Sequence, residues 1–180
     1  VEWKTLYEVS KNLNFKRIPI TQSKRKSGKF PYYGASGIVD YVSDYIFNGD
    51  YLLISEDGAN LIARKTPIAF SVTGKFWVNN HAHIIEFENY ATRRLVEIYL
   101  NSIDLSKFIT GAAQPKLNQD NLYKIQFPIP SIVEQERIVS ILDKFEELVN
   151  SSIPAEIAAR RKQYEYYREK LLKFKVKDKR

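Results

Sequence analysis

The last third of the chain predicts a long helix with an apolar face, which cannot be buried without a partner. Ser131 and Glu134 have the spacing of a capping box, in which each side chain accepts a backbone amide at a helix start. Pro154 is tolerated only in the first turn of a helix, so a second helix is expected to begin there. Between these points, apolar residues recur at helical spacing: Ile138, Ile141, Leu142, Phe145, Leu148 and Val149.

The second predicted helix carries a heptad seam, a row of side chains that recurs every seven residues on one face. A helix with such a seam usually packs against another helix, and a second copy of the chain would supply one. The five apolar or aromatic members form the predicted partner seam: Ile157, Tyr164, Tyr167, Leu171 and Phe174.

Composition excludes several classes of protein. The chain has no cysteine, so disulfide frameworks, cysteine-ligated zinc and thiol chemistry are excluded. The sequence contains no run of about 18 apolar residues, which a membrane span would require, and no signal peptide is visible at the start. The expectation is a cytoplasmic protein that does not enter a membrane.

The net charge of +7 is unevenly distributed along the chain. Residues 155–180 hold ten Lys and Arg against four Asp and Glu, and residues 16–29 hold six basic residues and no acid. Both segments could attract phosphate, and the alternative is that they are simply solvated.

The fold class is predicted as α+β. Residues 1–130 are expected to form a mixed α/β domain with short strands, and residues 131–180 a helical hairpin or a long coiled-coil helix. The apolar run 51–54 predicts a buried strand, and apolar spacing predicts a helix over 92–102. Two apolar runs flanking Thr73-Gly74-Lys75 predict a hairpin. The polar stretch 111–121 is expected to be a loop before a last strand near 123–127.

No catalytic or metal site is predicted. The chain lacks a glycine-rich phosphate loop between a strand and a helix, and it lacks the Asn-Pro-Pro-aromatic signature of amino-methyltransferases. His81 and His83, the two histidines, are expected on one strand face, without the further ligands that a metal needs. Glu56 and Asp57 are interpreted as turn residues.

A binding surface is the function class that remains. Aromatic residues between 30 and 51 lie next to the basic run 24–29, and cations beside polar groups suit contact with DNA phosphates and base edges. The alternative is that the tyrosines are half-buried core residues. The candidate DNA-contacting residues are Lys24, Arg25, Lys26, Lys29, Tyr32, Tyr33, Asn60, Arg64, Lys75, Asn79, Asn80, Gln114 and Lys116.

Several segments together resemble one known family. YYGASGIV at 32–39, YIFNG at 45–49, ISEDGAN at 54–60, NHAH at 80–83 and GAAQPKLN at 111–118 look like the target recognition domain of type I restriction-modification specificity subunits. PIP at 128–130, EQERIV at 134–139, ILD at 141–143 and RRKQYEYYR at 160–168 resemble its conserved helical region. Each segment alone is unspecific, but their order over the whole chain is specific.

The resemblance implies a non-catalytic subunit that binds double-stranded DNA. In this family two recognition domains, separated by antiparallel helices, each read one half of a split site. The subunit positions modification subunits, which use S-adenosylmethionine to methylate adenine, while ATP- and Mg-dependent work belongs to further subunits. With one recognition domain and one helical region, this chain is expected to be a natural half-subunit or a piece of a longer one, and to form a homodimer through its C-terminal helices.

Two other functions remain open at this point. One is a helical adaptor that binds only protein, with the first domain as a scaffold. The other is a stand-alone methyltransferase or nuclease, which the missing motifs disfavour. The sequence does not disclose which bases are read or the spacing of a split site.

Overall fold

The computed structural model describes residues 1–111 and 113–172, with side chains as far as Tyr167. It divides into two compact units, Val1–Glu136 and Arg137–Arg180. The predicted domain boundary between residues 130 and 131 lies six residues before this division and stays a prediction. The α+β fold class is confirmed, because a mixed sheet is followed by long helices.

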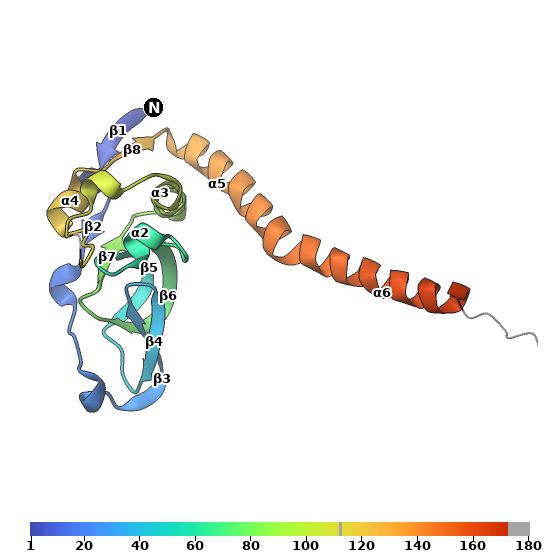
Figure 1. The fold of residues 1–180 in the computed structure, drawn as a ribbon. Coiled ribbons are helices and arrows are strands. Elements are labelled where there is room, and N and C mark those ends of the chain that lie inside the picture. Colours follow the sequence, from blue (N-terminus) through green and yellow to red (C-terminus); the bar gives the residue numbers. More distant parts are fainter. Residues whose placement is uncertain (112, 173–180) are drawn as a thin grey trace, which may run out of the picture. The chain divides into compact units, whose positions relative to one another are not determined.

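A six-stranded sheet forms the centre of the first unit (Figure 1). Its pairs are antiparallel except that of β3 with β6, which is parallel at Tyr32–Trp77 and Tyr33–Val78. The predicted strand at 51–54 is confirmed as part of the central strand β5. In spatial order the strands are β2 (Lys11–Asn12), β7 (Ala82–Glu86), β5 (Phe47–Ser55), β6 (Ala69–Val78), β3 (Ser27–Gly34) and β4 (Gly37–Val42).

The predicted hairpin at Thr73–Lys75 is wrong, because β6 runs through these residues as one strand. Gly74 pairs with Gly49 in the middle of the β5–β6 ladder. Both glycines have positive φ, +82° for Gly74 and +148° for Gly49, so they allow a local irregularity without a reversal of the chain. A glycine between two apolar runs is ambiguous in sequence, since a bulged long strand and a hairpin give the same pattern.

Both faces of the central sheet are buried, and the side chains of β5 alternate between them. Leu52 and Ile54 belong to one core cluster, while Leu53 belongs to the other. Helix α3 (Tyr90–Ser102) contributes Val96 and Leu100 to the first cluster. The predicted helix over 92–102 is confirmed, and its start is capped by the Asn89 side chain, which accepts from the amide of Thr92 at 2.8 Å.

The ends of the first unit meet in a separate two-stranded sheet. Strand β1 (Glu2–Thr5) pairs antiparallel with β8 (Gln126–Ile129), so the predicted last strand lies a few residues further along. The short connecting helices are α1 (Leu6–Val9), η1 (Asn14–Lys16), η2 (Gln22–Lys24), α2 (Asn60–Ala63), η3 (Ser106–Phe108) and α4 (Gln119–Tyr123).

Helical conformation is continuous from α5 (Ile132–Glu147) through the π-helical turn η4 (Leu148–Ser152) to α6 (Ile153–Leu172). A long helix, rather than a hairpin, therefore follows the first domain. Pro154 lies in the first turn of α6, as predicted. Leu171 lies in α6 with its side chain outside the described part, and Phe174 lies outside the described residues. Among residues 1–111 and 113–172, no helix has the length and apolar character that a membrane crossing requires.

The first turn of α5 is fixed to the rest of its unit by a buried amide. Gln135, 4% exposed, accepts a hydrogen bond from the Thr92 hydroxyl of α3 at 2.7 Å. Its amide nitrogen donates to the Pro130 carbonyl at 2.9 Å. Both groups are buried, so each depends on the other for its hydrogen bond.

Replacing Gln135 by alanine is expected to lower the free energy of unfolding by about 1–3 kcal/mol, because the Thr92 hydroxyl would stay buried without its partner. The measurement is urea unfolding followed by circular dichroism. Glu136→Ala, at an exposed position one residue further, is the matched control and should change little. Equal loss in both variants would contradict the role of this bond.

Candidate nucleic-acid interface

Four of the predicted DNA-contacting lysines are exposed and available. Lys24 ends η2, Lys26 and Lys29 lie before and within β3, and Lys75 lies in β6. None of the four is in an ion pair with any residue of the described part. Their ammonium groups are therefore not neutralised by a carboxylate of the described part and can contact phosphates.

The arginines of the same basic segment are engaged inside the unit instead. Arg17 donates to Glu56 Oε2 at 2.7 Å and to the Ala82 carbonyl at 2.8 Å. Arg25 donates to Asp40 and to the Ile20 carbonyl, each at 3.1 Å, and its guanidinium lies 4.3 Å from the centre of the Tyr32 ring. The planar guanidinium suits such multiple contacts, so Arg25 braces the fold rather than offering a free charge.

Tyr32 and Tyr33 lie in the core rather than on an open surface. Tyr32 is 1% exposed, and its hydroxyl accepts from the amide of Ile20 at 3.1 Å. The half-buried Tyr33 ring packs 6.0 Å from Phe70 and 5.6 Å from Phe76, and burial raises the pKa of its hydroxyl. Tyr32 could contact DNA only after unpacking, which favours the alternative of a structural role.

Three further candidates make internal hydrogen bonds. The Asn60 side chain accepts from the Thr66 amide at 3.1 Å and donates to the Thr66 carbonyl at 2.9 Å, which closes a loop. Arg64, with φ of +50°, donates to the carbonyls of Leu100 and Ile103 at the end of α3. Asn79 is 8% exposed and accepts from the amide of His81 at 2.8 Å. These side chains position the backbone, while Asn80, Gln114 and Lys116 remain exposed.

Glu56, interpreted from sequence as a turn residue, follows the end of β5 and is also the centre of a cluster of charged and polar side chains. Its carboxylate lies 2.7 Å from Arg17, 3.4 Å from Lys116 and 3.7 Å from His83. Burial alone would raise the pKa of Glu56. The hydrogen bond from Arg17 and the nearby positive charges outweigh burial, so its pKa lies below the ordinary value.

The two histidines have different environments. Asn14 can only donate through Nδ2, so His83 Nδ1 accepts that bond at 2.8 Å, and His83 Nε2 donates to the Leu117 carbonyl at 2.7 Å. Burial lowers the pKa of His83, consistent with a neutral ring. His81 is half exposed and lies 2.9 Å from Asp57. Within the described residues, no three His, Cys, Asp or Glu side chains are grouped as a metal site would require.

Residues 115–117 brace the turn after β5. The Pro115 carbonyl accepts from the amide of Gly58 at 3.0 Å, and the amide of Leu117 donates to the Glu56 carbonyl at 2.8 Å. These bonds place Lys116 beside Glu56, with which it forms an ion pair. Arg17 also donates a hydrogen bond to the Asn80 carbonyl at 3.4 Å. The predicted candidates thus include two groups. One is the exposed lysines at positions 24, 26, 29 and 75, and the other, with Asn80 and Lys116, lies at the turn after β5.

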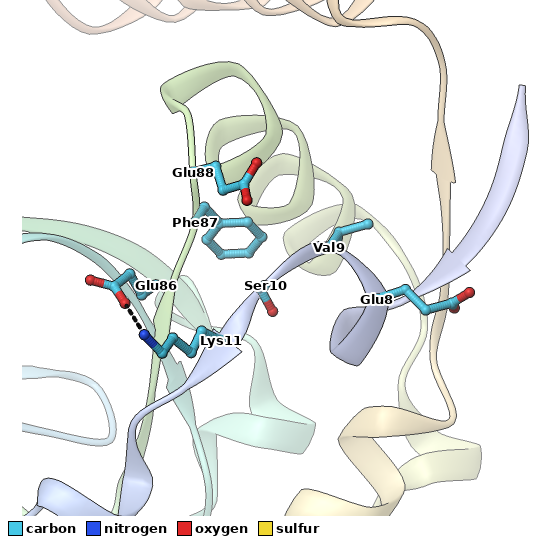
Figure 2. A pocket seen from close by; sticks show the side chains of 7 residues that line it. All are labelled: Glu8, Val9, Ser10, Lys11, Glu86, Phe87 and Glu88. Atoms are coloured by element: carbon cyan, nitrogen blue, oxygen red, sulfur yellow. Dashed lines mark ion pairs between the residues drawn. The ribbon is translucent and has the colours of Figure 1, made fainter.

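A cavity of about 530 Å³ is lined by residues that belong to neither group (Figure 2). It contains a single ion pair between the residues drawn, Lys11 with Glu86 at 3.7 Å. Three carboxylates against one ammonium disfavour phosphate, so this cavity is not part of the candidate interface. Its lining is Glu8, Val9, Ser10, Lys11, Glu86, Phe87 and Glu88.

Comparisons with known proteins agree on one family. The family model for the type I restriction modification DNA specificity domain matches residues 1–159. A candidate type I restriction enzyme specificity subunit of Haemophilus influenzae is 40% identical over 96% of this chain and 46% of its own length. The specificity subunit of an Escherichia coli type I restriction enzyme is 31% identical, over 97% of this chain and 48% of its own.

Solved structures support the same fold. The S subunit of a type I restriction-modification system from M. genitalium superposes with a TM-score of 0.62 at 13% identity, covering 95% of this chain and 46% of that one. A chain from a type I restriction-modification assembly gives 0.61 at 17% identity, over 91% of this chain and 43% of that one. The chain thus spans about half the length of the relatives that it matches.

The environments of His83 and Glu56 predict a loss of stability on acidification. The pKa of His83 is lowered from its ordinary 6.5, so the unfolded chain binds the proton more readily, and stability falls as the pH drops below about 6.5. The pKa of Glu56 is lowered from 4.5, so its contribution is present above that value and is lost as the pH falls through the folded-state pKa.

The measurement is the melting temperature between about pH 7.5 and pH 5. His83→Gln is the control variant, because its amide keeps one acceptor and one donor but does not titrate, so the fall in this window should be smaller. A wild-type melting temperature that stays constant across the window would contradict the assignment.

Proposed function

This chain belongs to the family of type I restriction modification DNA specificity domains, and we propose that it reads one half of a split sequence in double-stranded DNA. The match over residues 1–159 carries the proposal, because it includes both the sheet domain and most of the helical region. The exposed lysines at 24, 26, 29 and 75 support it, since free cations on one unit favour a polyanion.

In this proposal the chain itself does no chemistry. It would dock onto modification subunits, which would bind S-adenosylmethionine and methylate adenine, and through them it would act with the restriction subunit. ATP and Mg would likewise be held by those partners. Its own contribution is the choice of the DNA sequence and the placement of its partners on it.

The second part of the proposal is a homodimer through the C-terminal helices. Ile157, Tyr164 and Tyr167 on α6 are 53%, 65% and 50% exposed, although their side chains are large and mainly apolar. A groove of about 430 Å³ runs along this helix between Ile153 and Tyr164 and is lined mainly by apolar surface. Burying such side chains against a second copy would be favourable, and it would supply a second recognition domain for a split site.

A helical adaptor that binds only protein is the competing function. It would use the same seam on α6 but would leave the lysines of the first unit without a ligand. Sequence-selective binding of duplex DNA is the observation that separates the two, because only the specificity subunit requires it.

Selection from a random pool of duplex DNA is expected to recover one preferred half-site with this chain. The chain should be assayed alone and with a modification subunit, because docking could strengthen the readout. A pool recovered without enrichment in either condition, while the protein remains folded, would count against the DNA function and for the adaptor.

Charge placed in the seam is expected to break the dimer. Ile157→Glu with Tyr164→Glu should reduce the particle mass at micromolar concentration from twice 21.0 kDa to a single chain. Ala159→Glu is the matched control, because this exposed residue lies on the opposite face of α6. Light scattering that shows only single chains for the wild type would rule out the homodimer.

A further inference from the structure

Two aromatic rings and two lysines form a continuous row on the sheet of the first unit. Lys29 Nζ lies 5.4 Å from the centre of the Phe30 ring, and the rings of Phe30 and Tyr45 are 5.0 Å apart at 57°. Lys75 Nζ lies 4.7 Å from the centre of the Tyr45 ring. Both rings are partly exposed and both lysines are exposed. Hereafter these four residues are called the lysine–aromatic row.

A β-bulge places the first lysine of the row. Ser27 and Phe30 both pair with Val42 of β4, so Gly28 and Lys29 are extra residues in the strand. A Cβ on Gly28 would lie 2.3 Å from Ser43 Cα, so only glycine lets the bulge lie against that backbone. β-Bulges change the direction in which side chains point, and they are common beside functional sites. We therefore interpret this bulge as a feature that orients Lys29.

The other end of the row is equally fixed. Lys75 lies within the β5–β6 ladder, opposite Asn48. The chain next to Tyr45 is held by the amide of Ile46, which donates to the Phe76 carbonyl at 3.1 Å. The backbone that carries Lys75 is therefore part of the sheet, and the segment that carries Tyr45, between β4 and β5, is hydrogen-bonded to it.

The charges around the row favour a polyanion. The two arginines of the segment 16–29 are paired with Glu56 and Asp40, while neither lysine of the row has an ion pair among the described residues. A lysine over a ring in water gains little, so a phosphate can draw it away at small cost. The partly exposed rings then offer apolar surface between two phosphate contacts, which suits deoxyribose and base edges.

We propose that the lysine–aromatic row is a sequence-independent anchor for the DNA backbone. Lys29 and Lys75 each contact a phosphate, and Phe30 and Tyr45 pack against the sugar and base edges between them. The inference rests on the proposed DNA-reading function and adds the residues that hold the duplex. Sequence choice then falls to other residues of the unit, since phosphate contacts carry no base information.

The test is a salt titration of binding to a duplex of random sequence, with the full 180-residue chain. Lys29→Ala with Lys75→Ala should reduce the slope of log affinity against log salt by about 2, because each phosphate contact contributes about 0.9. The matched control is Lys65→Ala with Lys107→Ala, which removes the same charge. Lys107 also lies over a ring, 5.0 Å from Phe108, but outside the row. The control should keep the wild-type slope.

The rings are tested separately with Phe30→Leu and Tyr45→Leu, which keep apolar side chains in place. Affinity should fall roughly fivefold with the salt slope unchanged, because ring contacts are lost while phosphate contacts remain. An unchanged affinity would overturn the role of the rings.

The outcomes separate the anchor from the proposed function. A wild-type chain that binds, with the row variant and the control showing the same slope, overturns the anchor and leaves the DNA function standing. A wild-type chain that binds no duplex, alone or with modification subunits, overturns both.

Discussion

The carboxylate of Glu56 is the interaction on which the arrangement of the first unit most depends. It joins Arg17 from the segment after η1, His83 from β7 and Lys116 from the brace after η3, at the point where β5 ends. Burying this carboxylate would be costly without the positive charges of Arg17 and Lys116, while the neutral His83 ring lies 3.7 Å from it. Segments distant in sequence are thereby held in one register around the end of the central strand.

In the first unit, several arginines are hydrogen-bonded internally whereas the lysines of the candidate interface are exposed, and this difference determines which charges a ligand can contact. The guanidinium groups of Arg17 and Arg25 each donate to a carboxylate and a backbone carbonyl inside the unit, and that of Arg64 donates to two backbone carbonyls. The lysines of the same basic segment stay in solvent, where a flexible ammonium remains available. The local charge of the sequence is therefore a poor measure of the charge that a ligand meets.

Periodic features of the fold were predictable from sequence, and tertiary hydrogen bonds were not. The strand at 51–54, the helix at 92–102 and the first-turn position of Pro154 follow from spacing and backbone chemistry alone. The hairpin at Gly74 failed because its pairing with Gly49 depends on another strand. Tyr32, Asn60 and Arg64 have side chains suited to DNA, but they meet internal partners that no local pattern discloses. For the exposed candidates, contact with DNA stays a prediction.

The pairing of β1 with β8 has a consequence for how such a unit is built into longer proteins. Glu2 lies opposite Ile129, so the polypeptide enters and leaves the sheet domain at nearly the same point. A module with adjacent entry and exit can be exchanged for another of the same design while the distance between its neighbours is preserved. Under the proposed DNA-reading function, such an exchange would change the recognised sequence and leave the segments on either side unaltered.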